Sequence, residues 1–435
     1  MWYQVAYAIV LGSVILLSAM TLGAQTATPT VESGEMPIVV METPTPRPTT
    51  LNIGATLTSD FDDNAFNDNR HGRYNSLTVI EPHVRLAFSR SHYEWNLDYR
   101  QGFSISQPLT TFSSRSHILD TSIQSKISKR LAFRAEEEFL ESTNPFDGLL
   151  ESTNSRDTTI IDRPAGSIVT PLRTRSEQAG LSLTYAVRSH STFAAVGSFF
   201  DVNQTSLGAT DALGNTRSVS GHAIYSRRLS RRHSMGIDYG TQTLIARSPQ
   251  VRARVQSFSY ANTVTLTPSS VLSFSGGPER AVIGNQSIPV DSLEPAGEGR
   301  SSWNWVGSAA YKWSDGEHSA LANYSHRLTN GEGLLGIVRL SDVSTQLQRR
   351  LTRKWHAGLL ASYDNERTVG VISSGLSYVS IAGGFTRNLN RTVSFQLVYW
   401  RIHELMDAAG STVLHANHNR VSVSLTYNLE EVIRK

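Results

Sequence analysis

Hydrophobic and polar residues alternate one by one along most of the chain, and short turn-forming sequences separate the alternating runs. In the run from Trp355 to Asp364, the odd positions are apolar or aromatic and the even positions are mostly polar or small. Successive side chains of a β-strand point to opposite faces, so this pattern predicts a strand with one apolar face. The pattern recurs from Leu51 to Leu429 and therefore predicts an all-β protein.

Short and long connections alternate between the predicted strands. The short ones are Ser89–His92, Ser128–Leu131, Arg188–Thr192, Arg227–Arg232, Thr267–Ser270, Ser314–Glu317, Arg349–Arg353 and Arg387–Arg391. The longer ones are Asp62–Tyr74, Ile105–Arg115, Ser142–Thr174, Gln204–Thr216, Ala246–Val251, Pro278–Arg300, Asn330–Leu334, Glu366–Gly370 and Leu405–Asn417. This layout is typical of a transmembrane antiparallel up-and-down β-barrel with short periplasmic turns and longer external loops. The number of turns predicts about 18 strands, within a range of roughly 16–20.

Aromatic residues lie at both ends of the apolar rows, with small residues between them, as in Trp303–Trp313. Trp and Tyr favour the two membrane interfaces because each has an apolar body and a polar tip. A soluble β-sandwich or β-solenoid would also alternate, but its core gives no reason for small residues in the middle of each row. We therefore favour the membrane barrel. The predicted interface aromatics are Tyr93, Trp95, Tyr99, Trp303, Trp305, Tyr311, Trp313, Trp355, Tyr363, Tyr399 and Tyr427.

The N-terminal region predicts export from the cytoplasm. Val5–Leu22 is nearly all apolar and precedes Gly23-Ala24-Gln25, which predicts a signal peptide over residues 1–24. An uncleaved membrane anchor is the alternative, because residues 1–4 carry no Lys or Arg. Residues 25–50 are rich in Thr and Pro and predict an extended linker. The barrel is then expected over residues 51–429, followed by a charged tail over 430–435.

Composition narrows the chemistry. The chain contains no Cys, which excludes disulfides and thiolate metal sites, and its net charge of +3 gives no case for nucleic-acid binding. No hydrolase, zinc-protease or phosphate-loop motif occurs, so we expect no enzyme, no catalytic residue and no cofactor. Ser220 and His222 share one strand face without an evident third partner, which makes an outer-membrane hydrolase the less favoured alternative.

Acidic and amide side chains crowd the end of the first predicted strand, at Asp60, Asp62, Asp63, Asn64 and Asp68. Oxygen ligands of this kind suit Ca²⁺, but their spacing is not that of a calcium-binding loop. A hydrogen-bonded loop is therefore expected here, and no metal site.

The segment Phe61-Asp62-Asp63-Asn64-Ala65-Phe66-Asn67 resembles the aromatic-Asp-Asp-Asn-x-Phe element of the outer-membrane β-barrel porin type 2 family. Proteins of that family often accompany exopolysaccharide or capsule systems in Gram-negative bacteria. The resemblance implies an outer-membrane location and suggests a role in export. The partners expected of such a protein are outer-membrane lipid, lipopolysaccharide and the barrel-assembly machinery.

A barrel of this size is wide enough for an aqueous lumen. Charges of both signs are predicted to face it, so they either filter solutes weakly or form salt bridges that stiffen the wall. The longest connection, Ser142–Thr174, either narrows the lumen or lies outside as an external loop. We expect a porin-like channel for hydrophilic solutes or exported polysaccharide; the alternative is a non-conducting barrel that serves as a surface or assembly component. The predicted lining charges are Arg85, Glu94, Asp98, Arg100, Arg134, Glu136, Glu138, Asp238, Lys312 and Asp364.

Overall fold

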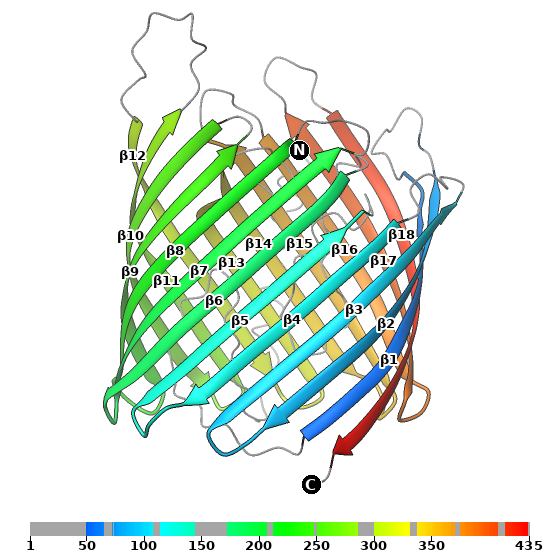
Figure 1. The fold of residues 1–435 in the computed structure, drawn as a ribbon, viewed down its shortest axis with the longest axis horizontal. Helices are drawn as coiled ribbons and strands as arrows, with labels where there is room; N and C mark the ends of the chain where they lie inside the picture. The colour runs from blue at the N-terminus through cyan, green and yellow to red at the C-terminus, as the bar shows by residue number, and fades with distance from the viewer. Residues whose placement is uncertain are drawn as a thin grey trace, which may run out of the picture.

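The computed structural model describes residues 49–64, 72, 74–107, 114–143, 172–206, 212–247, 250–285, 300–330, 337–369, 375–407 and 414–433. These residues form one antiparallel sheet of 18 strands that closes into a barrel (Figure 1). The strands are β1 (Thr49–Asp62), β2 (Asn75–Ser89), β3 (Tyr93–Gln107), β4 (Ser114–Lys126), β5 (Leu131–Ser142), β6 (Leu172–Arg188), β7 (Ser191–Ser206), β8 (Ala212–Arg228), β9 (His233–Arg247), β10 (Gln250–Thr267), β11 (Ser270–Asn285), β12 (Arg300–Ser314), β13 (His318–Asn330), β14 (Ile337–Arg350), β15 (Trp355–Thr368), β16 (Gly375–Asn388), β17 (Val393–Asp407) and β18 (Leu414–Ile433).

The first and last strands close the barrel. β1 pairs with β2 on one side and with β18 on the other, in a continuous register from Thr49 opposite Ile433 to Asp62 opposite Arg420. Because β1 pairs with β18, neither the first nor the last strand leaves its edge open to lipid, where unpaired backbone groups are costly. The predicted all-β barrel of about 18 strands is confirmed.

The eight predicted short turns all lie at one end of the barrel, together with the end of β18 (Figure 1). Three of them share the sequence pattern Leu-(Ser/Thr/Asn)-Arg and also share their geometry. In each, the Leu N–H donates to a backbone carbonyl four residues on, and the Ser, Thr or Asn side chain accepts a backbone N–H. Such local hydrogen bonds make these residues strong turn formers. The three turns begin at Leu229, Leu351 and Leu389.

Several predicted long connections at the other end are longer than the segments between the observed strands. β9 ends at Arg247 and β10 begins at Gln250, so paired strand residues take up most of the connection predicted over Ala246–Val251. β11 continues past Pro278 to Asn285, although Pro278 was expected to begin a loop. The alternation of inward and outward residues persists after Pro278, and pairing with β12 continues despite the missing N–H.

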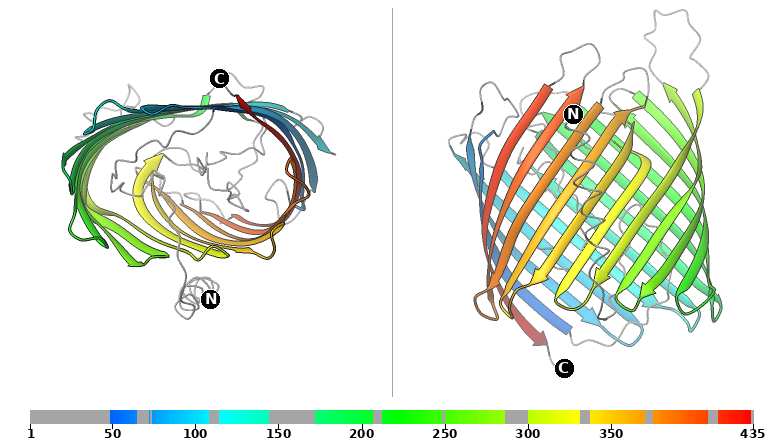
Figure 2. Two further views of the ribbon diagram at one scale, coloured as in Figure 1. Left: turned by 90° about the horizontal axis from the view of Figure 1, so that it is seen from below. Right: turned by 180° about the vertical axis from the view of Figure 1, so that it is seen from behind.

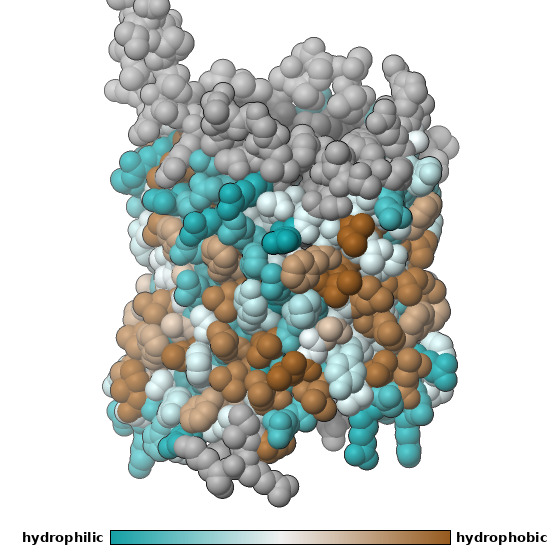
Figure 3. Space-filling model, turned by 45° about the vertical axis from the view of Figure 1, so that its right-hand side comes forward, coloured by the Kyte–Doolittle hydropathy of each residue, from teal (hydrophilic) through white to brown (hydrophobic). Residues whose placement is uncertain are grey.

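On the face that Figure 3 shows, hydrophobic side chains run across the middle and lower part of the outer wall, and hydrophilic ones lie toward the upper end and at the bottom edge. β18 runs through Ile433, so residues 430–433 continue the strand. Among the described residues, no helix is long and apolar enough to cross a membrane.

Candidate functional site in the barrel interior

Contacts across the barrel identify the inward face of each strand. Leu328 of β13 packs in one buried cluster with Leu244 of β9, although β10, β11 and β12 separate these strands in the sheet. The two side chains can meet only through the interior, so Leu244 points inward. Strand alternation then turns Asp238 inward and Tyr239 outward, and Tyr239 is 49% exposed on the outer surface.

Register carries this assignment around the barrel. It places the ten predicted lining charges on the inward face. Their role in lining a conducting path stays a prediction. The eleven predicted interface aromatics lie on the outward face, where Trp303 is 70% exposed. The lining charges are Arg85, Glu94, Asp98, Arg100, Arg134, Glu136, Glu138, Asp238, Lys312 and Asp364.

Ion pairs connect neighbouring strands along one sector of the inner wall. Arg85 on β2 donates to Asp98 on β3 at 2.6 Å, and Arg100 on β3 donates to Asp120 on β4 at 2.8 Å. Sequence analysis did not identify Asp120, although strict alternation along β4 would have placed it inward. Each of these two guanidinium groups thus has a carboxylate beside it on the next strand, so the pairs are neutral and keep this sector of the wall polar.

The candidate hydrolase residues do not form a Ser–His pair. His222 is 3.0 Å from Asp238 on β9, and the Ser220 hydroxyl is 2.7 Å from the hydroxyl of Ser198 on β7. Gly240 on β9 lies opposite His222 in register, and a Cβ atom there would stand 2.8 Å from the imidazole ring. The glycine therefore leaves room for His222 to reach across the strand to Asp238.

The acidic cluster at the end of β1 joins it to β18. Asp62 accepts a hydrogen bond from His418 at 3.1 Å, and Asp60 pairs with Arg420 at 2.6 Å. Asp63 accepts the backbone N–H of Asn419 at 2.7 Å. These carboxylates thus link the first strand to the last one, where the barrel closes. Hydrogen bonds connect the cluster, as the sequence predicts. Asp68 lies outside the described residues.

One hairpin leaves the barrel wall and enters the interior. β12 pairs with β13 only from Gly307–His326 to Ser314–Ser319, whereas β13 stays paired with β14 as far as Asn330 opposite Ile337. The end of β13 that lies beyond this pairing bends inward, as the yellow arrow inside the ring shows (Figure 2, left). We call the ends of the two strands, residues 327–330 and 337–340, the inner hairpin.

Apolar contacts hold the back of the inner hairpin against the wall. Leu328 and Ile337 are 3% and 2% exposed, and they pack against Leu244, Ala253 and Ala281 on the inward face of β9–β11. Both alanines are fully buried. Their small side chains let the hairpin approach the wall closely.

Polar contacts add to this attachment. Arg339 of β14 donates to the side-chain oxygen of Asn304 on β12 at 2.5 Å. It also faces the buried Glu279, the neighbour of Asn304 in register. Where β12 and β13 separate, the ring of Trp305 stacks on His326 at a centroid distance of 4.3 Å. The inner hairpin is therefore fixed by both apolar and charged groups.

The opposite side of the hairpin is covered in part as well, since Val338 is fully buried against Leu376 of β16. Arg327 of β13 lies 3.6 Å from Asp342 of β14, and its guanidinium donates to Ser325 at 2.6 Å. These groups add polar side chains to the space that the hairpin narrows. The connection Ser142–Thr174, for which the sequence leaves an inward or an external position open, lies mostly outside the described residues.

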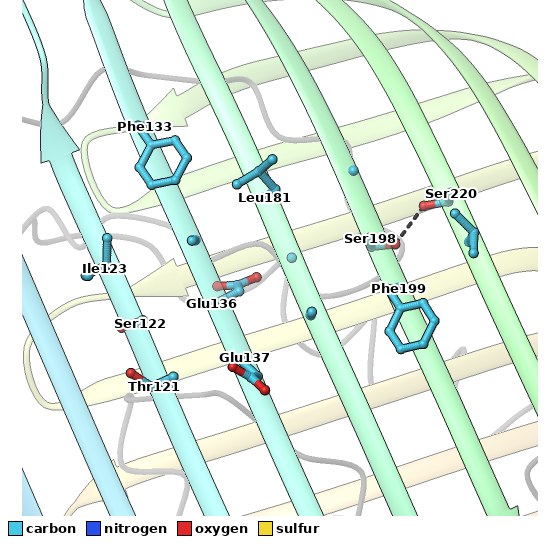
Figure 4. Close-up of a pocket in the computed structure, with 15 residues that line it drawn as sticks. Thr121, Ser122, Ile123, Phe133, Glu136, Glu137, Leu181, Ser198, Phe199 and Ser220 are labelled. Atoms are coloured by element: carbon cyan, nitrogen blue, oxygen red, sulfur yellow. Dashed lines mark hydrogen bonds between the residues drawn. The ribbon is translucent and has the colours of Figure 1, made fainter.

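A shallow hollow lies on the outer face of β4–β8 (Figure 4). Phe133, Leu181 and Phe199 project around it. Small residues such as Ala179 also line it. The exposed carboxylate of Glu137 stands among these apolar side chains. Because it points away from the lumen, this hollow is separate from the candidate channel.

The closed barrel, its apolar outer face and its polar inner face define a transmembrane β-barrel, a class that belongs to the bacterial outer membrane. No family model and no curated protein matches the sequence.

Solved structures with a similar shape include OccK2 (OpdF) from Pseudomonas aeruginosa, with 10% identity and a TM-score of 0.46 over 88% of this chain and 98% of that one. The ferric-catecholate import receptor Fiu from E. coli K12 matches at 6% identity and a TM-score of 0.44, over 89% of this chain and 82% of that one. The siderophore receptor PirA from Pseudomonas aeruginosa matches at 11% identity and a TM-score of 0.42, over 89% of this chain and 81% of that one. These likenesses concern overall shape alone.

Proposed function

We propose that this protein is a passive outer-membrane channel for hydrophilic solutes. The observation that carries the proposal is the inner wall, where ionised side chains of both signs are paired across neighbouring strands, as in Arg85–Asp98 and Arg100–Asp120. Such a lining favours water and polar solutes over lipid, and its mixed charge predicts weak ion selectivity. The inner hairpin would then set the width of the path.

Polysaccharide export is the more specific form of this proposal. It rests on the resemblance of Phe61–Asn67 to an element of the porin type 2 family. A long uncharged glycan would be favoured by a wall whose charges neutralise one another, because strong fixed charge is not needed to bind it. We propose no enzymatic role, since the hydroxyl of Ser220 is bonded to Ser198 and His222 is paired with Asp238.

A non-conducting barrel is the second candidate, and the inner hairpin is the observation that favours it. Leu328 and Ile337 bury themselves against the inner wall and occupy part of the lumen. A barrel narrowed in this way could serve as a surface or assembly component.

Conductance of the purified protein in a planar bilayer tests the proposal. Stepwise, voltage-independent openings with weak cation–anion selectivity are expected. A matched comparison uses Asp98→Asn, which leaves Arg85 without its partner and should shift the selectivity toward anions. If the protein is shown to be folded and inserted but the bilayer gives no conductance at any voltage, the non-conducting barrel is established instead.

A further inference from the structure

Three outward arginines on β10 and β11 make no ion pair within the described part of the chain. Arg252, Arg254 and Arg280 are all exposed. Their chain neighbours Ala253 and Ala281 are fully buried on the inward face, so strand alternation turns the three arginines outward. The three guanidinium groups therefore form a positive patch on the outside of the barrel.

The register brings these arginines together. Arg254 lies opposite Val282 on β11, only two residues along the strand from Arg280. Arg252 and Arg254 are next-but-one neighbours on β10, so each adjacent pair of side chains is separated by about 7 Å at its base. Side chains as long as that of Arg can converge from this spacing on one phosphate group. Arg280 also donates to the hydroxyl of Ser301 on β12 at 3.3 Å.

Two outward arginines on β6 and β8 differ because carboxylates neutralise them. Arg173 on β6 pairs with Glu141, and Arg217 on β8 pairs with Asp201 at 3.1 Å. On β11, the carboxylate next to Arg280 in the chain is Glu279, which points inward and is buried. The patch thus keeps the charge that Arg173 and Arg217 lose to their carboxylate partners.

The patch lies above an aromatic surface. Following the outward face of β10 toward the short turns, Arg252 and Arg254 are succeeded by Phe258 and Tyr260, which are 51% and 42% exposed. On β12, the highly exposed Trp303 stands opposite Arg280. The order from cationic to apolar matches an anionic headgroup above its acyl chains.

We propose that Arg252, Arg254 and Arg280 bind a phosphate of an outer-leaflet glycolipid of the lipid A type. The acyl chains of this lipid lie along Phe258 and Trp303, and the charge of the patch complements the phosphate. The proposal requires the arginine end of the barrel to face outward from the cell. It does not require the barrel to conduct.

Native mass spectrometry of the detergent-purified barrel with added bisphosphorylated lipid A tests this site. The variant Arg252→Gln/Arg254→Gln/Arg280→Gln is compared with Arg231→Gln/Arg232→Gln/Arg353→Gln, which removes the same charge from exposed short turns. Retention of the folded, unboiled band on a gel shows that each variant is intact. We expect the affinity for lipid A to fall by on the order of a hundredfold in the first variant alone.

Two further ligands identify the chemistry. Fully dephosphorylated lipid A should bind weakly and equally to wild type and to both variants, because the phosphate is missing. Inorganic phosphate at millimolar concentration should not displace lipid A, because the aromatic surface holds the acyl chains. Equal affinity of wild type and the first variant overturns the site, as does an equal loss in the turn variant or displacement by free phosphate.

Discussion

At the scale of single residues, the hollow on the outer face contains one group that opposes membrane insertion. Glu137 is exposed midway along β5, between Phe133 and Phe199, and no hydrogen bond to it occurs within the described residues. A carboxyl group at this depth must either shed its charge or draw water into the apolar band. No hydrogen bond or ion pair within the described residues offsets this cost, so we expect Glu137 to lower the stability of the barrel in the membrane.

Replacing this carboxyl group should stabilise the protein. Glu137→Leu is expected to raise the free energy of unfolding in lipid vesicles by roughly 1–2 kcal/mol, measured by urea titration. Glu136→Leu is the matched control, because Glu136 points inward and pairs with Arg134 at 2.8 Å. That substitution should not stabilise the barrel. A destabilised Glu137→Leu variant would contradict the assignment of this side chain to the lipid face.

Another residue-scale prediction concerns the turn Asp315-Gly316-Glu317 between β12 and β13. Slight burial raises the pKa of Asp315. The backbone N–H groups of His318 and Glu317, at 2.6 and 3.0 Å, and the His318 ring lower the pKa by more than burial raises it. The net effect is a pKa below the ordinary value of 3.8. Gly316 completes the turn at φ = 87°, a conformation that glycine adopts without strain.

The lowered pKa gives this turn a defined pH dependence. A carboxyl group whose pKa is lower in the folded state adds stability above its unfolded pKa, and this stability disappears as the pH falls through the folded value. Asp315→Asn should therefore be less stable than wild type at neutral pH, and the two should converge below the ordinary value of 3.8. Urea unfolding over a pH series measures the difference. A gap that widens on acidification would have the wrong sign.

At the scale of elements, alternation and turn chemistry were sufficient to predict the strands and the eight short turns. They could not predict the inner hairpin, because a strand alternates in the same way whether it lies in the wall or inside it. Only one sign was present in the sequence: Leu328, Ile337 and Val338 are apolar near the end of the barrel where other strands become polar. Their partners on β9–β11 are distant in sequence, so no local pattern could pair them.

The hairpin makes a prediction of its own. Leu328→Asn/Ile337→Asn should detach it from the wall, because each substitution places an unsatisfied amide in an apolar contact. We expect the unitary conductance to change by about twofold or more as the lumen widens or the freed hairpin fluctuates within it. The control Leu360→Asn/Val398→Asn removes similar inward apolar contacts on β15 and β17. It should leave conductance unchanged, and equal conductance in all three proteins would show that the hairpin is not part of the path.

At the scale of the whole molecule, orientation decides which end meets the cell surface. The predicted topology places the short turns in the periplasm, where both ends of the barrel also lie. Because the chain contains no Cys, one introduced thiol reports one position. Asp407→Cys at the exposed end of β17 and Thr352→Cys in a short turn sample opposite ends of the barrel.

On intact cells, an impermeant thiol reagent should label the cysteine of Asp407→Cys and spare that of Thr352→Cys. Both should react after the outer membrane is permeabilised, which controls for chemical access to each thiol. The opposite labelling pattern on intact cells would show that the barrel has the reverse orientation in the membrane. The arginine patch would then face the periplasmic leaflet, where lipid A is absent, and the proposed phosphate site would fail while the case for a channel remained intact.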